Sequence, residues 1–157
     1  MAPSTSLRAR WLQFKFNLFP CYRRTGVKVV FIAADLREVH IRLPLNWKTK
    51  GYFGTTFGGT IYGAVDPVYM VMLNMLLGAE YIVWDKAAKI DFKRPGRATL
   101  NAKFAVPERE TQAVVDALVN SDKIERVYTV DLIDDKEQIC ASVEKTLHIR
   151  RRRRTNK

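Results

Sequence analysis

The segment from Gly59 to Gly78 constrains the fold most, because it is apolar almost throughout and is interrupted by one acid and a proline. Its apolar residues recur at spacings of three and four, which predicts a helix, and most other positions are apolar too. A helix that is apolar on every side is buried on every side. We therefore expect a helix over roughly residues 58–77 with the rest of the chain wrapped around it.

Segments that alternate apolar and polar residues predict about six strands around this helix. These segments lie at residues 27–32, 39–43, 81–92, 98–106, 124–134 and 138–150. Short turns separate most of them, and hairpin-joined strands make an antiparallel sheet. The sequence therefore predicts an α+β fold, with a sheet wrapped around one central helix, in a single domain of 157 residues.

The two ends of the chain carry distinct patterns. An amphipathic helix is predicted over residues 6–18, where apolar side chains recur at helical spacing. These side chains are Trp11, Phe14, Leu18 and Phe19. We expect this helix to pack on its own domain. Anchoring to a membrane surface is the alternative, because Arg8, Arg10 and Lys15 lie among the apolar residues. Residues 150–157 form a basic tail, read as a solvated terminus, with nucleic-acid or anionic-membrane binding as the alternative.

Composition excludes several classes of protein. The net charge is +11, but the folded part has no nucleic-acid recognition motif, so we expect no specific nucleic-acid partner. Cys21 and Cys140 have no metal-site or disulfide-framework spacing, so we expect no metal and a reducing, cytoplasmic location. We also expect no transmembrane segment, since the longest apolar region contains Asp66 and Pro67.

The predicted helix starts with two glycines, Gly58 and Gly59. The first N–H groups of a helix have no internal partner, and the helix dipole adds positive charge there. Without side chains, a ligand can approach the backbone closely, which suits a carbonyl oxygen that becomes negative during a reaction. The alternative is close packing of the helix start on a strand.

Asp66 is costly inside an apolar helix unless it is paired or protonated. Pro67 removes a helical N–H, and local conflicts of this kind tend to mark functional sites. A buried carboxylate has a raised pKa, which suits a base or a nucleophile. Gly58 and Asp66 are about 12 Å apart along a helix, so one carbonyl can reach both only if they come from two chains. This reading requires a homodimer, with a dimer of dimers left open.

The stretches "FGG" with an acid nine positions after the Phe, "YIVWDKA" and "EKTLHIRR" resemble the hotdog-fold thioesterases of the phenylacetate-pathway type. They are most similar to an uncharacterised bacterial branch of that superfamily. The resemblance implies a hotdog fold acting on acyl-CoA or another acyl thioester, with coenzyme A as part of the substrate and no separate cofactor. It implies that the Gly58 N–H polarises the thioester carbonyl and that Asp66 of the opposite subunit is the catalytic carboxylate.

This sequence departs from the family pattern at two positions. Phe57 replaces the family's histidine, and Gly51 stands where an amide side chain is common, so Asn46 is the candidate substitute. We therefore predict an acyl-CoA thioesterase-like enzyme, with a non-catalytic acyl-thioester binding module as the alternative. Two groups of predicted ligand contacts complete the site. Acyl contacts are predicted at Phe57, Gly59, Tyr62, Tyr69, Trp84 and Asn46, and phosphate contacts at Lys93, Arg94 and Arg97.

Overall fold

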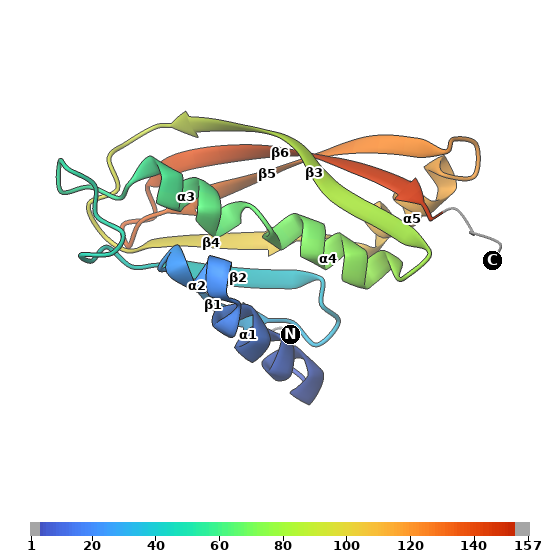
Figure 1. The fold of residues 1–157 in the computed structure, drawn as a ribbon, viewed down its shortest axis with the longest axis horizontal. Coiled ribbons are helices and arrows are strands. Elements are labelled where there is room, and N and C mark those ends of the chain that lie inside the picture. Colours follow the sequence, from blue (N-terminus) through green and yellow to red (C-terminus); the bar gives the residue numbers. More distant parts are fainter. Residues whose placement is uncertain (1–3, 153–157) are drawn as a thin grey trace.

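The computed structural model describes residues 4–152, and Figure 1 shows helices packed on one twisted sheet. In chain order the elements are α1 (Leu7–Leu18), α2 (Pro20–Arg24), β1 (Lys28–Ile32), β2 (Glu38–Leu43), α3 (Gly58–Val65), α4 (Val68–Leu77), β3 (Tyr81–Phe92), β4 (Leu100–Ala105), α5 (Glu108–Ala117), β5 (Lys123–Ile133) and β6 (Ile139–Arg151). The predicted α+β architecture, a six-stranded antiparallel sheet around central helices, is confirmed.

The strand order across the sheet is β1-β2-β4-β5-β6-β3, and every neighbouring pair is antiparallel. β1 with β2 and β5 with β6 are hairpins, as expected. β3 and β4 follow one another in the chain but do not pair, so the expectation of mostly hairpin-joined strands fails there. The segment 93–99 carries the chain from the edge of the sheet, where β3 lies beside β6, to its middle.

The central helix is divided in two at Asp66 and Pro67. The amide of Asp66 still donates to the carbonyl of Tyr62 at 2.9 Å, but α4 starts a new set of bonds with the Val71 amide on the Pro67 carbonyl at 2.9 Å. Proline has no N–H to continue the α3 ladder, so carbonyls at the break need other donors. The Tyr22 hydroxyl supplies one, donating to the carbonyl of Ala64 at 2.8 Å.

One side of α3 and α4 packs into the core, and the other side does not. The buried side chains are Ile61, Ala64, Val65, Val68, Tyr69, Met72 and Leu73. Elsewhere on these helices Tyr62 is 38% exposed and Met75 is 37% exposed, so the expectation of burial on every side is wrong for the single chain. The sequence was expected to contain no transmembrane segment, but by length and composition alone Gly58–Leu77 is apolar enough to span a membrane. Here it lies against the sheet as a core helix does.

α1 packs on its own domain, as expected, but with its predicted apolar face turned outward. The Ser6 side chain caps the helix by accepting from the Ala9 amide at 3.1 Å. Asn17 exchanges two hydrogen bonds with the backbone of Val29, and Gln13 donates to the Val29 carbonyl. An edge strand leaves backbone groups unpaired, so these amides cover the open edge of β1. The side chains left facing solvent are Trp11, Phe14, Leu18 and Phe19.

The basic tail begins inside the fold. Arg150 and Arg151 belong to β6, and the Arg152 amide donates to the carbonyl of Glu80 at 2.7 Å. The rest of the predicted tail, residues 153–157, lies outside the described residues.

Candidate functional site

Asp66 lies at the break between α3 and α4, where a lysine from the sheet reaches it. Lys145 Nζ donates to Asp66 Oδ1 at 2.8 Å. The Lys145 side chain is 0% exposed, whereas that of Asp66 is 40% exposed. A buried ammonium is unfavourable without a partner, so this pairing explains how the core accepts the lysine. Asp66 was expected to be buried, but it is paired and partly open to solvent.

Asp85 is the second carboxylate on Lys145. Its Oδ1 lies 2.9 Å from Lys145 Nζ, which makes an ion pair. Asp85 faces inward beside Leu147, and a bulge follows between Asp85 and Ala87. Burial raises the pKa of Asp85, and the neighbouring ammonium offsets only part of that effect.

Asp66 affects the pKa of both Lys145 and Tyr62. Burial alone would lower the pKa of Lys145, but its contacts with Asp66 and Asp85 more than reverse this, and the pKa is raised. Lys145 also lies 5.1 Å from the ring centre of Tyr62. The neighbouring Asp66 carboxylate, with burial second, raises the pKa of the Tyr62 hydroxyl. The four side chains therefore form one charged cluster, Asp66–Lys145–Asp85 with Tyr62, beneath the helix break.

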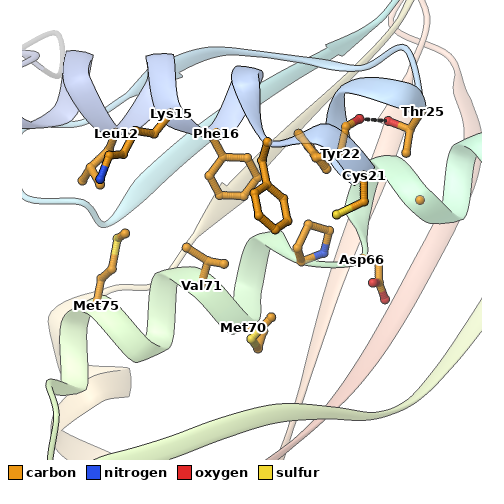
Figure 2. A pocket seen from close by; sticks show the side chains of 13 residues that line it. Leu12, Lys15, Phe16, Cys21, Tyr22, Thr25, Asp66, Met70, Val71 and Met75 are labelled. Atoms are coloured by element: carbon orange, nitrogen blue, oxygen red, sulfur yellow. Dashed lines mark hydrogen bonds between the residues drawn. The ribbon is translucent and has the colours of Figure 1, made fainter.

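An apolar groove of about 680 Å³ lies between α1–α2 and α3–α4, with Asp66 near its α2 end. Leu12 and Phe16 extend into it from α1, and Val71 and Met75 from α4 (Figure 2). Its volume and apolar walls are typical of a small-molecule site, with few polar groups to fix orientation. Of the site residues predicted from sequence, Asp66 alone lines this groove.

The start of α3 is covered by aromatic rings. A side-chain carbon added at Gly58 would lie 3.1 Å from the Phe92 ring, and one at Gly59 would lie 2.6 Å from the ring of Phe57. The ring at Gly58 comes from β3, so the helix start packs closely on a strand there, whereas the ring at Gly59 is that of Phe57 just before the helix. The two rings are themselves more than half exposed, so the helix start lies near the surface.

The predicted phosphate contacts also lie at this end of α3. Lys93, Arg94 and Arg97 are exposed on the turn after β3. The Gly96 carbonyl in the same turn accepts the Thr56 amide at 2.8 Å, which holds the turn beside the loop that enters α3. Lys93 pairs with Asp91. Within one chain, Gly58 and the basic turn thus lie at one end of α3, and Asp66 lies at the other.

The other predicted contacts are dispersed. Asn46 is exposed in the loop before α3, where its side chain accepts the Lys48 amide at 2.9 Å. Tyr69 is a core residue, stacked on Tyr128 and donating to the Thr129 carbonyl at 3.1 Å. Trp84 is on the outer face of the sheet, stacked on His148 at 4.7 Å. A ligand contact at these three positions stays a prediction.

Sequence reasoning missed Lys145 and the role of Asp85. The signal for Lys145 was the alternation in β6, where Val143, Leu147 and Ile149 occupy the same inward face. A lysine in register with these buried residues requires an acid from another part of the chain, and Asp66 is the acid that lies within the apolar helical segment. Among residues 4–152 no group of His, Cys, Asp and Glu has the geometry to hold a metal, and Cys21 and Cys140 are free thiols.

A family model described as "Domain of unknown function (DUF4442)" matches residues 10–149. The chain belongs to this family. A search of curated proteins finds no match. The family membership agrees with the uncharacterised branch that the sequence motifs indicated.

The fold of this chain is similar to that of several solved structures. A Pseudomonas aeruginosa protein of unknown function, described as a probable thioesterase, superposes with a TM-score of 0.80 at 12% identity, over 91% of this chain and 95% of its own. A thioesterase from Haemophilus influenzae gives 0.69 at 13% identity, over 96% of each chain. The E. coli PaaI protein from the phenylacetic acid degradation operon gives 0.62 at 17% identity, over 88% and 91%. At these identities the likeness establishes the fold alone, which is the predicted hotdog fold.

Proposed function

We propose that this protein hydrolyses an acyl thioester, with Asp66 as the general base. The observation that carries the proposal is the meeting of three features at Asp66: the helix break, the buried Lys145 and the apolar groove. Lys145 fixes one carboxylate oxygen, which leaves the other to accept a proton from water. The resulting hydroxide attacks the thioester carbonyl, the C–S bond breaks, and the thiol leaves with a proton.

The proposed site is completed by a second copy of the chain. Gly58 and Asp66 lie at opposite ends of α3, so one carbonyl near Asp66 meets the Gly58 N–H of a partner. Because the turn with Lys93, Arg94 and Arg97 lies at the Gly58 end, that same partner would meet the coenzyme A phosphates. The acyl chain would then occupy the groove beside Asp66. The thioesterases among the structural neighbours support this substrate class.

A non-catalytic acyl-thioester binding protein is the second candidate, and two observations favour it. The rings of Phe57 and Phe92 crowd the helix start where a thioester carbonyl would be polarised. Asp66 is also already engaged by Lys145. Both observations are compatible with holding an acyl chain without cleaving it.

A panel of short, long and aromatic acyl-CoA substrates with a free-thiol readout tests the proposal. We expect hydrolysis by the wild type, and Asp66→Asn should reduce turnover by at least about 10²-fold with little change in acyl-CoA affinity. Asp122→Asn removes an exposed acid elsewhere and should leave turnover unchanged. Binding without hydrolysis on every chain length would establish the second candidate, and light scattering that shows a monomer would exclude the shared site.

A further inference from the structure

The outward face of α1 is apolar, although the helix is already packed on the domain. Four side chains make up this face, here called the outer stripe. They are Leu7, Trp11, Phe14 and Leu18, exposed by 84%, 55%, 61% and 50%. Their spacings of four, three and four place them on one side of the helix. Leaving four large apolar side chains in water on one helix face is unusual for a surface with no partner.

The orientation of α1 is fixed by the polar side chains on its inner face. Asn17 and Gln13 hydrogen-bond the backbone of Val29, and Ala9 is fully buried beneath the helix. Rotating α1 to bury the outer stripe would break these bonds and reopen the edge of β1. The exposure of the stripe is therefore a consequence of how the helix is anchored.

The charge around the outer stripe has a single sign. On a helical projection Arg10 lies on one flank of the stripe, and Arg8 and Lys15 lie on the other, and all three are exposed. Arg23 and Arg24 follow in α2. The first acidic residue of the chain is Asp35, so nothing before it neutralises these cations. α1 also carries apolar Leu12 and Phe16 on the side turned to the domain, so only its exposed half combines an apolar stripe with rows of Arg and Lys. That exposed half suits a membrane interface, where apolar rings lie among the headgroups and cations meet lipid phosphates.

We propose that α1 docks on an anionic phospholipid surface, with the outer stripe inserted among the headgroups and the flanking cations on lipid phosphates. A second copy of the chain fits this face less well, because two such helices would bring their cations together. Nucleic acid fits less well too, since it matches the cations but leaves the stripe in water. Lys15 also lines the groove, so docking would bring the lipid surface to one edge of the groove. The docking proposal rests on the outer stripe and its cations and does not depend on the thioester proposal.

Vesicle co-sedimentation of the full chain tests this directly. We expect binding to mixed phosphatidylcholine–phosphatidylglycerol vesicles, much weaker binding to phosphatidylcholine alone, and loss of binding as salt increases. Trp11→Ser with Phe14→Ser should reduce the partition coefficient by at least about tenfold. The matched control is Trp47→Ser with Phe53→Ser, which removes the same two residue types from positions that are more exposed.

A second set of variants tests the contribution of the flanking cations. Arg8→Gln with Arg10→Gln should also weaken binding by about tenfold or more, whereas Lys123→Gln with Lys136→Gln, on the β5–β6 side of the sheet, should not. Unchanged thermal unfolding would show that each variant is folded. The proposal is overturned if the Trp47/Phe53 control loses binding equally, if the stripe variant binds as wild type, or if the stripe variant changes only the oligomeric state.

Discussion

Lys145 and the outer stripe of α1 depart from the usual distribution of residues in opposite directions. Lys145 is a charged side chain with no exposed area, whereas the stripe presents Trp11 and Phe14 to solvent. Both arrangements are uncommon in a soluble domain. The lysine is satisfied within the chain by Asp66 and Asp85, but within residues 4–152 no side chain buries the stripe.

The two regions differ in how strongly their side chains affect the stability of the fold. Removing one member of the buried cluster leaves its partners uncompensated, so the cluster is coupled to stability. Removing a stripe residue uncovers nothing inside, so the stripe is free to serve an external contact. The three predictions that follow test this difference, from the largest expected effect to the smallest.

Lys145→Met is expected to have the largest effect on stability. It leaves Asp66 and Asp85 facing each other without the cation, and should lower the free energy of unfolding by about 3 kcal/mol. This is the low end for a broken buried pair, because Asp66 is partly solvated. Chemical denaturation measures the change.

The triple variant Lys145→Met, Asp66→Asn, Asp85→Asn is the control for this prediction. Without any charge left in the cluster, most of the lost stability should return. If the triple variant is as unstable as Lys145→Met alone, the loss comes from packing around the lysine stem instead of from uncompensated charge.

Phe16 and Phe14 are a matched pair on the two sides of α1. Phe16 packs edge-on against Tyr22 at 4.8 Å and lines the groove, so Phe16→Ala should cost about 2 kcal/mol, less than for a fully buried phenylalanine. Phe14→Ala should change stability by no more than about 0.5 kcal/mol. Thermal and urea unfolding compare them, and equal losses would mean that the outer stripe contributes to the fold after all.

The smallest effect expected is a pH dependence from Asp85. Its pKa is raised in the folded state from 3.8, so the folded protein binds the proton more tightly than the unfolded chain. Stability from this group is therefore lost as the pH rises through the interval just above 3.8. Relative to Asp85→Asn, the wild type should become less stable across that interval in urea titrations at a series of pH values. A constant difference between the two proteins would contradict the raised pKa.

Local pattern was sufficient for most of the fold. Alternation predicted the strands, and the apolar run predicted one helix over residues 58–77 that Pro67 disturbs, because these signals depend on residues a few positions apart. The division of that helix into α3 and α4 was not predicted. The connection between β3 and β4 was not predictable in this way. A turn with proline and glycine is compatible with a hairpin. The hairpin is excluded only because β4 pairs with β2 on one side and with β5 on the other.

Asp66 was singled out from the sequence, but the side chains that contact it were not. Lys145 lies 79 positions further along the chain, and its side chain meets Asp66 only because β6 runs beneath the helix break. Asp85 joins them because β3 pairs with β6 and faces inward at that point.

The sequence by itself determined that α1 is a helix, that a buried Asp66 has to be paired or protonated, and that the chain forms an antiparallel sheet around an apolar helical segment. These follow from spacing, since backbone geometry repeats every 2 or about 3.6 residues. Only the tertiary structure decided which face of α1 turns inward. The unpaired backbone of Val29 at the edge of β1 requires hydrogen bonds that Asn17 and Gln13 can supply and that Trp11 and Phe14 cannot. Satisfying those polar groups outweighs burying the more apolar face, and this leaves the outer stripe in solvent.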